Sequence, residues 1–239
     1  MFNNSFYGNK NVKTYFIEFI LIFLAVTLGS LAENYREEWS DRQKEKGIKN
    51  AMIEDMEKNL SQIETYKKQC LFQLSMMSKT DSLLNIQPSK VDQKEYYKAL
   101  TSYSVVYMFT PSDESIKEAE TTGIVQNDSN DSLSRYLLKY QYFLQDIRLN
   151  EKLELDEFLR YQKEVIPQIT DSKLYKQVWS YPLGELSSKN GIKQVRPETR
   201  ERLDYFFAQM NFILTSQIVD LDSMAHYANR VIGYIERNK

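Results

Sequence analysis

The chain opens with one long run of apolar residues, and only after it does the pattern change to apolar residues recurring every three or four positions. From 14 to 34 the sequence is dominated by Leu, Ile, Phe and Val, and this is close to the roughly 20 residues that a membrane-spanning helix needs. Tyr15 on one side and Tyr35 and Trp39 on the other are typical of membrane boundaries. We therefore predict a membrane anchor at 14–34, after a short tail at 1–13.

An acidic residue, Glu18, lies near the start of this run. The apolar residues contribute about −3 to −7 kcal/mol to insertion, whereas a carboxylate costs about +2.5 to +3.5 kcal/mol at the centre of a span and less towards its ends. Insertion is therefore predicted in spite of Glu18. A signal peptide cut near Ser30–Ala32 is the alternative; the run is longer than a usual signal core, which favours an uncleaved anchor.

A helical wheel places Glu18 on a face with small residues. The face consists of Glu18, Ile22, Ala25, Gly29 and Ala32. The pair Ala25 and Gly29 lets two helix backbones approach closely in lipid, so this face is a candidate helix–helix interface with a second copy or another membrane protein. Two alternatives remain. The carboxylate can reach the head groups from its position near the boundary, or it can belong to a proton or ion path, for which the span offers only Thr27 and Ser30, both off this face.

Beyond the anchor, periodicity predicts one long helix that ends near Asn85, before Pro88. Its apolar stripe is Ile48, Met52, Met56, Leu60, Ile63, Tyr66, Cys70, Leu74 and Met77. Two more long helices follow, one running towards Pro167 and one from Pro197 to the C-terminus. Their inward residues are predicted as Leu133, Leu137, Tyr140, Leu144, Ile147, Leu155 and Phe158, and as Leu203, Phe207, Met210, Leu214, Ile218, Leu221, Ala225, Ala228 and Ile232.

Shorter elements join these helices. We expect a helix at about 92–104, then "VVYMF" as a strand or a buried connector. A further short helix is predicted to begin with Thr110 as its cap and Pro111 at its first position, and to stop at Gly123. With so few glycines and prolines between helical stretches, the predicted fold class is all-α: an N-terminal transmembrane helix continuing into a stalk helix and an elongated antiparallel helical bundle over 35–239.

One segment, 168–196, has no clear period. It contains Tyr175, Trp179 and Tyr181, which make it too aromatic for a flexible linker. Long irregular connections in compact domains are often functional. We predict an ordered cap at one end of the bundle, with a binding surface as the alternative.

Composition narrows the function classes. A net charge of −2, with basic and acidic residues mixed along the chain, gives no footprint for nucleic acid. The single cysteine, Cys70, and the single histidine, His226, one helical turn from Asp222, offer little for metal or triad chemistry. "DSNDS" at 128–132 lacks the glycine and the final glutamate of a calcium loop. We predict no cofactor, no metal and no enzymatic activity.

The order "IEFILIFLAVTLGSLAENYREEW", then a charged helix, then "DESIKEAETTGIVQNDSNDSLSRYLLKYQ" resembles an uncharacterised family of single-span membrane proteins found in Gram-negative bacteria. The matching residues are Glu18, Asn34, Trp39 and Gly123, and the likeness covers most of the chain. The resemblance implies an inner-membrane protein with a cytoplasmic N-terminus and a periplasmic bundle, and no activity. Lys and Arg counts on the two sides of the span favour the opposite orientation slightly.

The sequence thus predicts a membrane-anchored structural or protein-interaction subunit, oligomeric through its anchor and stalk helix. Its partners are the lipid bilayer and either further copies of the chain or another membrane protein. The alternative is a ligand-binding or sensor module that signals through a partner protein.

Overall fold

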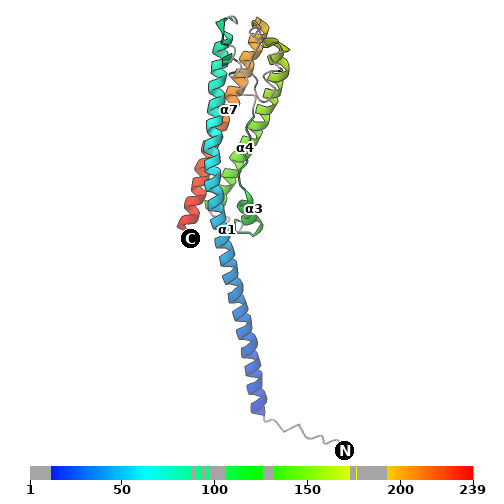
Figure 1. Cartoon of the computed structure of the whole chain (residues 1–239). Helices are drawn as coiled ribbons and strands as arrows, with labels where there is room; N and C mark the ends of the chain where they lie inside the picture. Colours follow the sequence, from blue (N-terminus) through cyan, green and yellow to red (C-terminus); the bar gives the residue numbers. More distant parts are fainter. Residues whose placement is uncertain are drawn as a thin grey trace, which may run out of the picture. The chain divides into compact units, whose positions relative to one another are not determined.

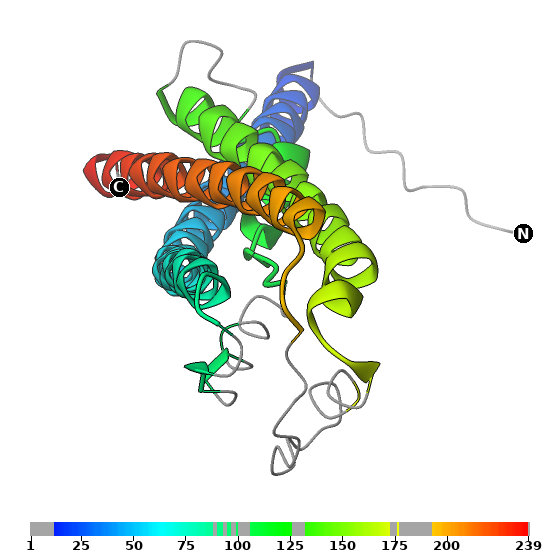
Figure 2. The same cartoon turned by 90° about the horizontal axis from the view of Figure 1, so that it is seen from above.

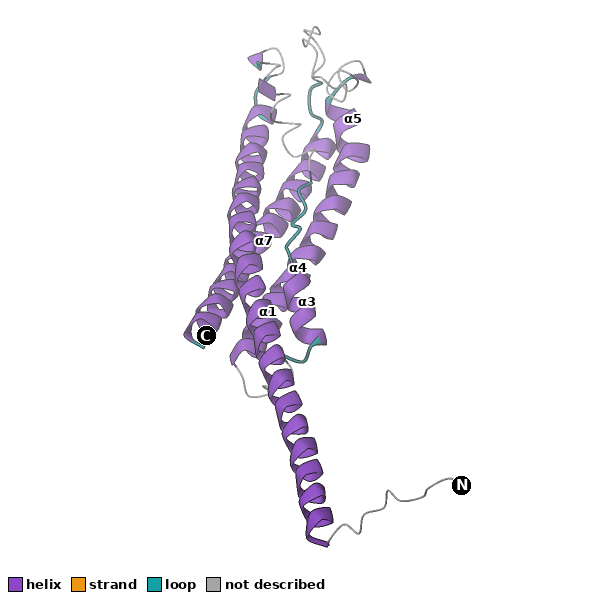
Figure 3. Cartoon of the chain, turned by 60° about the horizontal axis from the view of Figure 1, so that its bottom comes forward, coloured by secondary structure: helices purple, strands orange, loops and turns teal. Residues whose placement is uncertain are grey.

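The computed structural model describes residues 12–87, 90–92, 95–96, 99, 106–125, 132–172, 176 and 193–238. The chain divides into two compact units, Met1–Asn50 and Ala51–Lys239. The regular structure in the described part of the chain consists of helices without any strand (Figure 3), as the all-α prediction requires.

The helix α1 (Val12–Leu84) contributes residues to both units. In the first unit it begins with the apolar run and continues without a break into the charged segment. There, ion pairs one turn apart support a helix exposed to solvent: Arg36 with Glu33 at 2.6 Å and Arg42 with Glu38 at 3.7 Å. Such pairs add a few tenths of a kcal/mol each, which is how a solvated helical segment keeps its form without tertiary cover.

In the second unit the rest of α1 packs with α4 (Ser132–Arg160) and α7 (Pro197–Arg237), whose ribbons run side by side in Figures 1 and 2. Most of the predicted apolar stripes are buried, which confirms the inward faces in outline. The core residues from the three helices include Met52, Met56, Ile63, Tyr66, Cys70 and Met77, then Leu133, Leu137, Tyr140, Leu144 and Ile147, and Leu203, Met210, Leu214, Leu221 and Ala228.

Side-chain contacts give the directions of these helices. Lys67 and Cys70 of α1 meet Asp222 and Gln217 of α7, so these two helices are antiparallel. Against α4 the order is reversed: residues further along α1 meet residues further along α4. The contacts that show this are Asn59 with Tyr140 and Gln73 with Glu154. Helices α1 and α4 therefore run in the same direction, with α7 antiparallel to both. The predicted antiparallel arrangement thus holds for α7 and is wrong for the pair of α1 and α4.

A parallel pair of helices requires a connection that returns along the bundle. Residues 106–113 provide it, ahead of the short helix α3 (Glu114–Thr121), as the non-helical segment beside the long helices in Figure 3. The sequence allowed either a strand or a buried connector for "VVYMF". The part of it that the structure describes, 106–109, is a connector in which Phe109 is buried. Hydrogen bonds to successively earlier residues of α1 fix its course: Tyr66 to Tyr107, Asn59 to Ser112, and Asp55 to Ser115.

The predicted start of the short helix was wrong. Thr110 does not cap it and Pro111 is not its first position, because the backbone stays non-helical through residue 113. The first turn is instead capped from α1: Asp55 accepts hydrogen bonds from the Ser115 backbone N–H at 3.2 Å and the Ser115 hydroxyl at 2.5 Å. The predicted stop is confirmed, since Gly123 has a φ of 75°, which favours glycine.

The end of α4 contains a wider turn that the sequence did not suggest. Helix α4 passes into the π-helix η2 (Tyr161–Val165) and then into α5 (Ile166–Ile169). The Ile166 N–H donates to the carbonyl oxygen of Tyr161, five residues back. Pro167 has no N–H to donate and its ring crowds the preceding turn, so the widened turn accommodates a proline where a regular α-helix would break.

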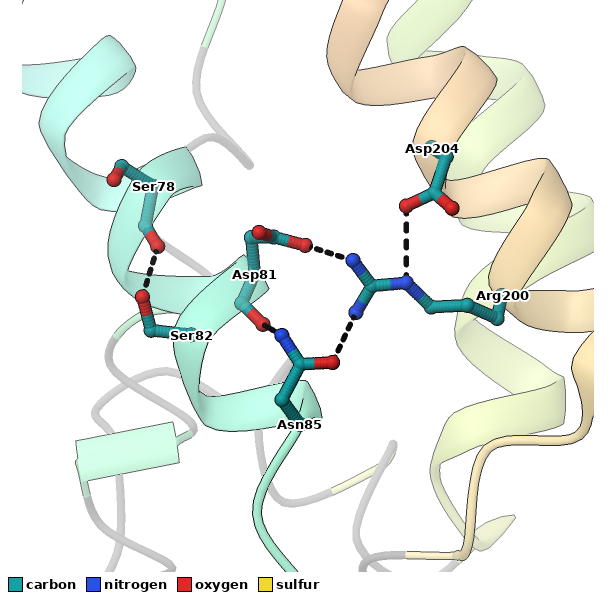
Figure 4. Close-up of polar contacts among 6 residues, drawn as sticks. All are labelled: Ser78, Asp81, Ser82, Asn85, Arg200 and Asp204. Carbon is teal, nitrogen blue, oxygen red and sulfur yellow. Dashed lines mark hydrogen bonds and ion pairs between the residues drawn. The ribbon is translucent and has the colours of Figure 1, made fainter.

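Polar contacts tie the end of α1 to the start of α7 (Figure 4). The guanidinium of Arg200 pairs with Asp81 of α1 and with Asp204 one turn further along its own helix, at 2.9 Å for the second pair. It also donates to the side-chain oxygen of Asn85 at 3.2 Å. Several donors of one fork-shaped group thus bridge two helices, which is the geometry in which an arginine contributes more than an isolated surface pair.

The buried amide of Asn59 carries a prediction for stability. It donates to the Ser112 carbonyl and to the Tyr140 hydroxyl and accepts from the Ser112 N–H, each at 2.8 Å. Replacement by alanine leaves the buried Tyr140 hydroxyl and the partly buried backbone groups of Ser112 without this partner, so Asn59→Ala should lower the free energy of unfolding by about 2–3 kcal/mol. Urea unfolding of the full chain in detergent, followed by circular dichroism, measures this. Tyr140→Phe, which removes a single partner, should cost about 1 kcal/mol; equal losses in the two variants would contradict the assignment.

Candidate functional site

The predicted membrane face lies on the first part of α1. Glu18, Ile22, Ala25, Gly29 and Ala32 all fall within this helix, so the helical spacing on which the prediction rests is present. A Cβ atom added to Gly29 meets nothing within 4 Å, so the backbone is open there to an approaching helix. The face is therefore available for contact in the first unit.

The same part of α1 is long and apolar enough to cross a membrane by length and composition. The residues of this window are not buried in the protein. The boundary aromatics are exposed as well, with Tyr15 at 58%, Tyr35 at 74% and Trp39 at 59% of their surface accessible. Together they leave an apolar helix surface that the protein itself does not cover.

A second candidate site, which the sequence did not reveal, lies within the helical bundle. Two glutamates of α4, Glu151 and Glu154, are buried, with Glu154 only 1% exposed. They are three residues apart and so share one helix face. We call this site the carboxyl cluster, and it comprises Glu151 and Glu154 together with Tyr66, Cys70 and Gln73 of α1 and Gln217 of α7.

Glu154 is held from two helices at once. Its Oε1 accepts a hydrogen bond from the Gln73 amide at 3.1 Å, and its Oε2 accepts one from the Gln217 amide at 3.2 Å. The Gln217 oxygen in turn accepts from the Cys70 thiol at 3.6 Å. Glutamine amides are neutral donors, so they satisfy the hydrogen-bonding groups of the carboxyl without neutralising its charge.

Glu151 lies one turn earlier and is held by the connecting segment. The backbone N–H of Phe109 donates to its Oε1 at 2.5 Å. The hydroxyl of Tyr66, which lies against the same carboxyl, donates to the Tyr107 carbonyl at 3.0 Å. In the described part of the chain neither cluster glutamate forms an ion pair with a lysine or arginine at salt-bridge distance.

Burial shifts the protonation of the cluster. Desolvation raises the pKa of Glu154 to about 7, although the amides of Gln217 and Gln73 act in the opposite direction. It also raises the pKa of Glu151, against the lowering effect of the Phe109 N–H. Protonated and ionised forms of Glu154 are thus both populated near neutral pH. The pKa of Cys70 is raised to about 12 and that of Tyr66 is raised as well, in each case chiefly by burial, so both remain neutral there.

This arrangement can bind and release a proton inside the bundle. In the described residues no group of three or more His, Cys, Asp or Glu side chains is placed to hold a metal ion. The thiol of Cys70 lacks the thiolate character that nucleophilic chemistry requires. Because burial raises the pKa of Glu154 to about 7, proton binding near neutral pH is the chemistry that the carboxyl cluster supports best.

The remaining sequence candidates have separate outcomes. Asp222, which the sequence placed near His226, forms an ion pair with Lys67 of α1 at 2.6 Å. His226 is exposed and its ring meets that of Tyr227 edge-on. The aromatic candidates Tyr175, Trp179 and Tyr181 lie outside the described residues. So does the "DSND" part of the loop at 128–132.

No protein-family model, curated protein or solved structure matches the chain. The resemblance to a family of single-span membrane proteins therefore stays a prediction, and function has to be argued from these two sites alone.

The position of Cys70 in the cluster predicts a protected thiol. It is 1% exposed and its pKa is raised to about 12. At neutral pH iodoacetamide should therefore alkylate the folded chain on the order of a hundredfold or more slower than the chain in concentrated urea. Because Cys70 is the single cysteine, mass spectrometry of the intact chain reads its modification directly. Equal rates in the folded and unfolded chains would show that the thiol does not lie in the core.

Proposed function

We propose that this chain is a membrane-anchored protein-interaction subunit that self-associates through the face of α1 containing Glu18, Ala25 and Gly29. The observation that carries the proposal is the exposed apolar surface of α1 in the first unit. Its large side chains, from Tyr15 to Leu31, are exposed on every side of the helix. Monomeric soluble proteins rarely expose a continuous apolar surface of this kind, and a bilayer is the partner that covers a helix all round.

Within the bilayer, apolar surface alone no longer drives association, because lipid tails are as apolar as the side chains. Close packing and polar contacts act instead. Ala25 and Gly29 are four residues apart, and the space over Gly29 is open. Glu18 lies on the same face and can hydrogen-bond across an interface, which helps to satisfy its carboxyl within the bilayer. This combination supports a helix–helix contact over a carboxylate that is merely tolerated.

The family resemblance supports a location in the inner membrane of a Gram-negative bacterium with the bundle in the periplasm. A bundle held there by α1 serves as a structural or docking module for envelope proteins, with further copies of the chain as its first partner. The ligand-binding alternative relied on the aromatic segment at 168–196, most of which lies outside the described residues, and it stays a prediction.

Anchoring predicts the behaviour of the chain in cells. A helix with this many apolar residues should resist extraction, so the protein should remain with membranes after washing with alkaline carbonate and leave them only in detergent. The purified protein should have the mass of the whole 239-residue sequence. A soluble chain that begins near Glu33 would instead identify residues before it as a cleaved signal peptide.

Association through the face predicts the effect of a bulky residue. Gly29→Leu fills the space over residue 29 and Glu18→Gln removes the carboxyl, so the double variant should associate roughly tenfold more weakly in detergent micelles. Sedimentation equilibrium and chemical crosslinking measure the oligomer. Thr27→Leu adds bulk on the opposite side of the same helix and should leave the oligomer unchanged. The interface would be refuted if the parent chain sediments as a monomer. It would also be refuted if the double variant associates as strongly as the parent chain.

A further inference from the structure

The carboxyl cluster has a geometry that connects its protonation to the packing of three helices. Glu154 lies on α4, and its two oxygens are bound by amides from α1 and α7. These three residues form one layer across the bundle: Glu154 of α4, Gln73 of α1 and Gln217 of α7. Any outward movement of one helix in this layer breaks a hydrogen bond to Glu154. At 1% exposure its carboxyl has no contact with bulk water while the bundle is closed.

We propose that the carboxyl cluster is a pH-sensitive latch: the bundle is held closed around Glu154 while this residue carries a proton, and opens locally when the proton is lost to solvent. The two amides donate to an ionised carboxylate and favour it, but they carry no positive charge, and a second carboxyl lies one turn away. The cost of burying the charge is larger than the effect of the amides, so the charge of an ionised Glu154 is poorly compensated. Exposure to water removes that penalty, and water can reach Glu154 only when the three helices separate locally.

Among the described residues, the groups facing Glu154 from every neighbouring element are compatible with this assignment. Tyr66 and Cys70 of α1 stay neutral in the relevant range because burial raises the pKa of each. From α7 the facing group is the neutral amide of Gln217, and the connecting segment presents the backbone of Phe109. On α4 itself the charged neighbours are Glu151, whose own pKa is raised by burial, and Arg148, which acts on Glu151 rather than on Glu154.

The direction of the pH effect follows from the two pKa values of Glu154. The ordinary pKa of the exposed carboxyl is 4.5, and in the closed bundle it is about 7. The closed state therefore binds the proton more tightly than the open state does. Its stabilisation is complete below pH 4.5, is lost progressively as the pH rises, and is gone above about pH 7. Alkaline conditions open the latch and acidic conditions close it.

The alkylation rate of Cys70 reports this opening, because the thiol lies in the same layer. The full chain in detergent is treated with iodoacetamide, and each rate is divided by that of the chain in urea at the same pH, which cancels the ionisation of the free thiol. Between about pH 5.5 and about pH 8.5 the protection of Cys70 should fall about 30-fold, as the two pKa values of Glu154 require.

Two variants test whether Glu154 is responsible. In Glu154→Gln the side chain keeps its shape and stays neutral, so the protection of Cys70 from alkylation should be independent of pH. Asp156→Asn removes the same charge from an exposed position on the same helix. The protection of Cys70 in this variant should fall with rising pH as it does in the parent chain. A fall of equal size in Glu154→Gln, or constant protection in the parent, would overturn the latch.

A measurement on the unsubstituted chain covers the case in which Glu154→Gln does not fold. The infrared C=O band of protonated carboxyl groups should lose intensity with a midpoint near pH 7, because burial holds the Glu154 pKa at about that value. Loss of the whole band below about pH 5.5, where exposed carboxyls have titrated, would refute the proposal.

Discussion

The contact on which the bundle depends is that of Glu154 with the amides of Gln73 and Gln217. Apolar side chains drive the three helices together, but they slide past one another at little cost because many packings bury similar area. A buried carboxyl does not allow this freedom, since a shift of one turn leaves it without donors, at a cost of about 1–3 kcal/mol or more for each unsatisfied group. The contact therefore specifies which turn of α4 lies between which turns of α1 and α7.

Asn59 has the same role at the other end of the bundle, where it sets the path of the chain. Its amide binds both backbone groups of Ser112 as a neighbouring strand would. The connection consequently stays non-helical up to residue 113 and carries the chain back along α1. Only with this return can α4 run parallel to α1, since a short turn between them would have made the pair antiparallel. Polar residues in the core thus determine the topology, and apolar residues supply the driving force.

This division explains which parts of the fold could be predicted. Helix existence, the end of α1 and the start of α7 follow from apolar spacing and proline, and they were predicted. The alternating spacing of four and three in α4, continued beyond Ile147, leads to Glu151 and Glu154, but a search for apolar residues passes over them to Leu155 and Phe158. In α7 it selects Ile218 where Gln217 is buried. The missed signal was the unbroken spacing itself, which marks a position as inward whatever residue occupies it.

The two patterns along α1 show how one continuous helix can enter two environments. Between Tyr15 and Leu31 apolar side chains cover every side, which suits a surrounding bilayer, whereas from Met52 onwards they form a single stripe, which suits a bundle in water. The segment between them keeps its helix through pairs such as Arg36 with Glu33, which require no tertiary contact. A change of pattern without a helix break is expected of a chain whose surroundings change along its length. In the anchor that we propose, the change near Glu33 marks the end of the apolar part of α1 and the start of its charged part.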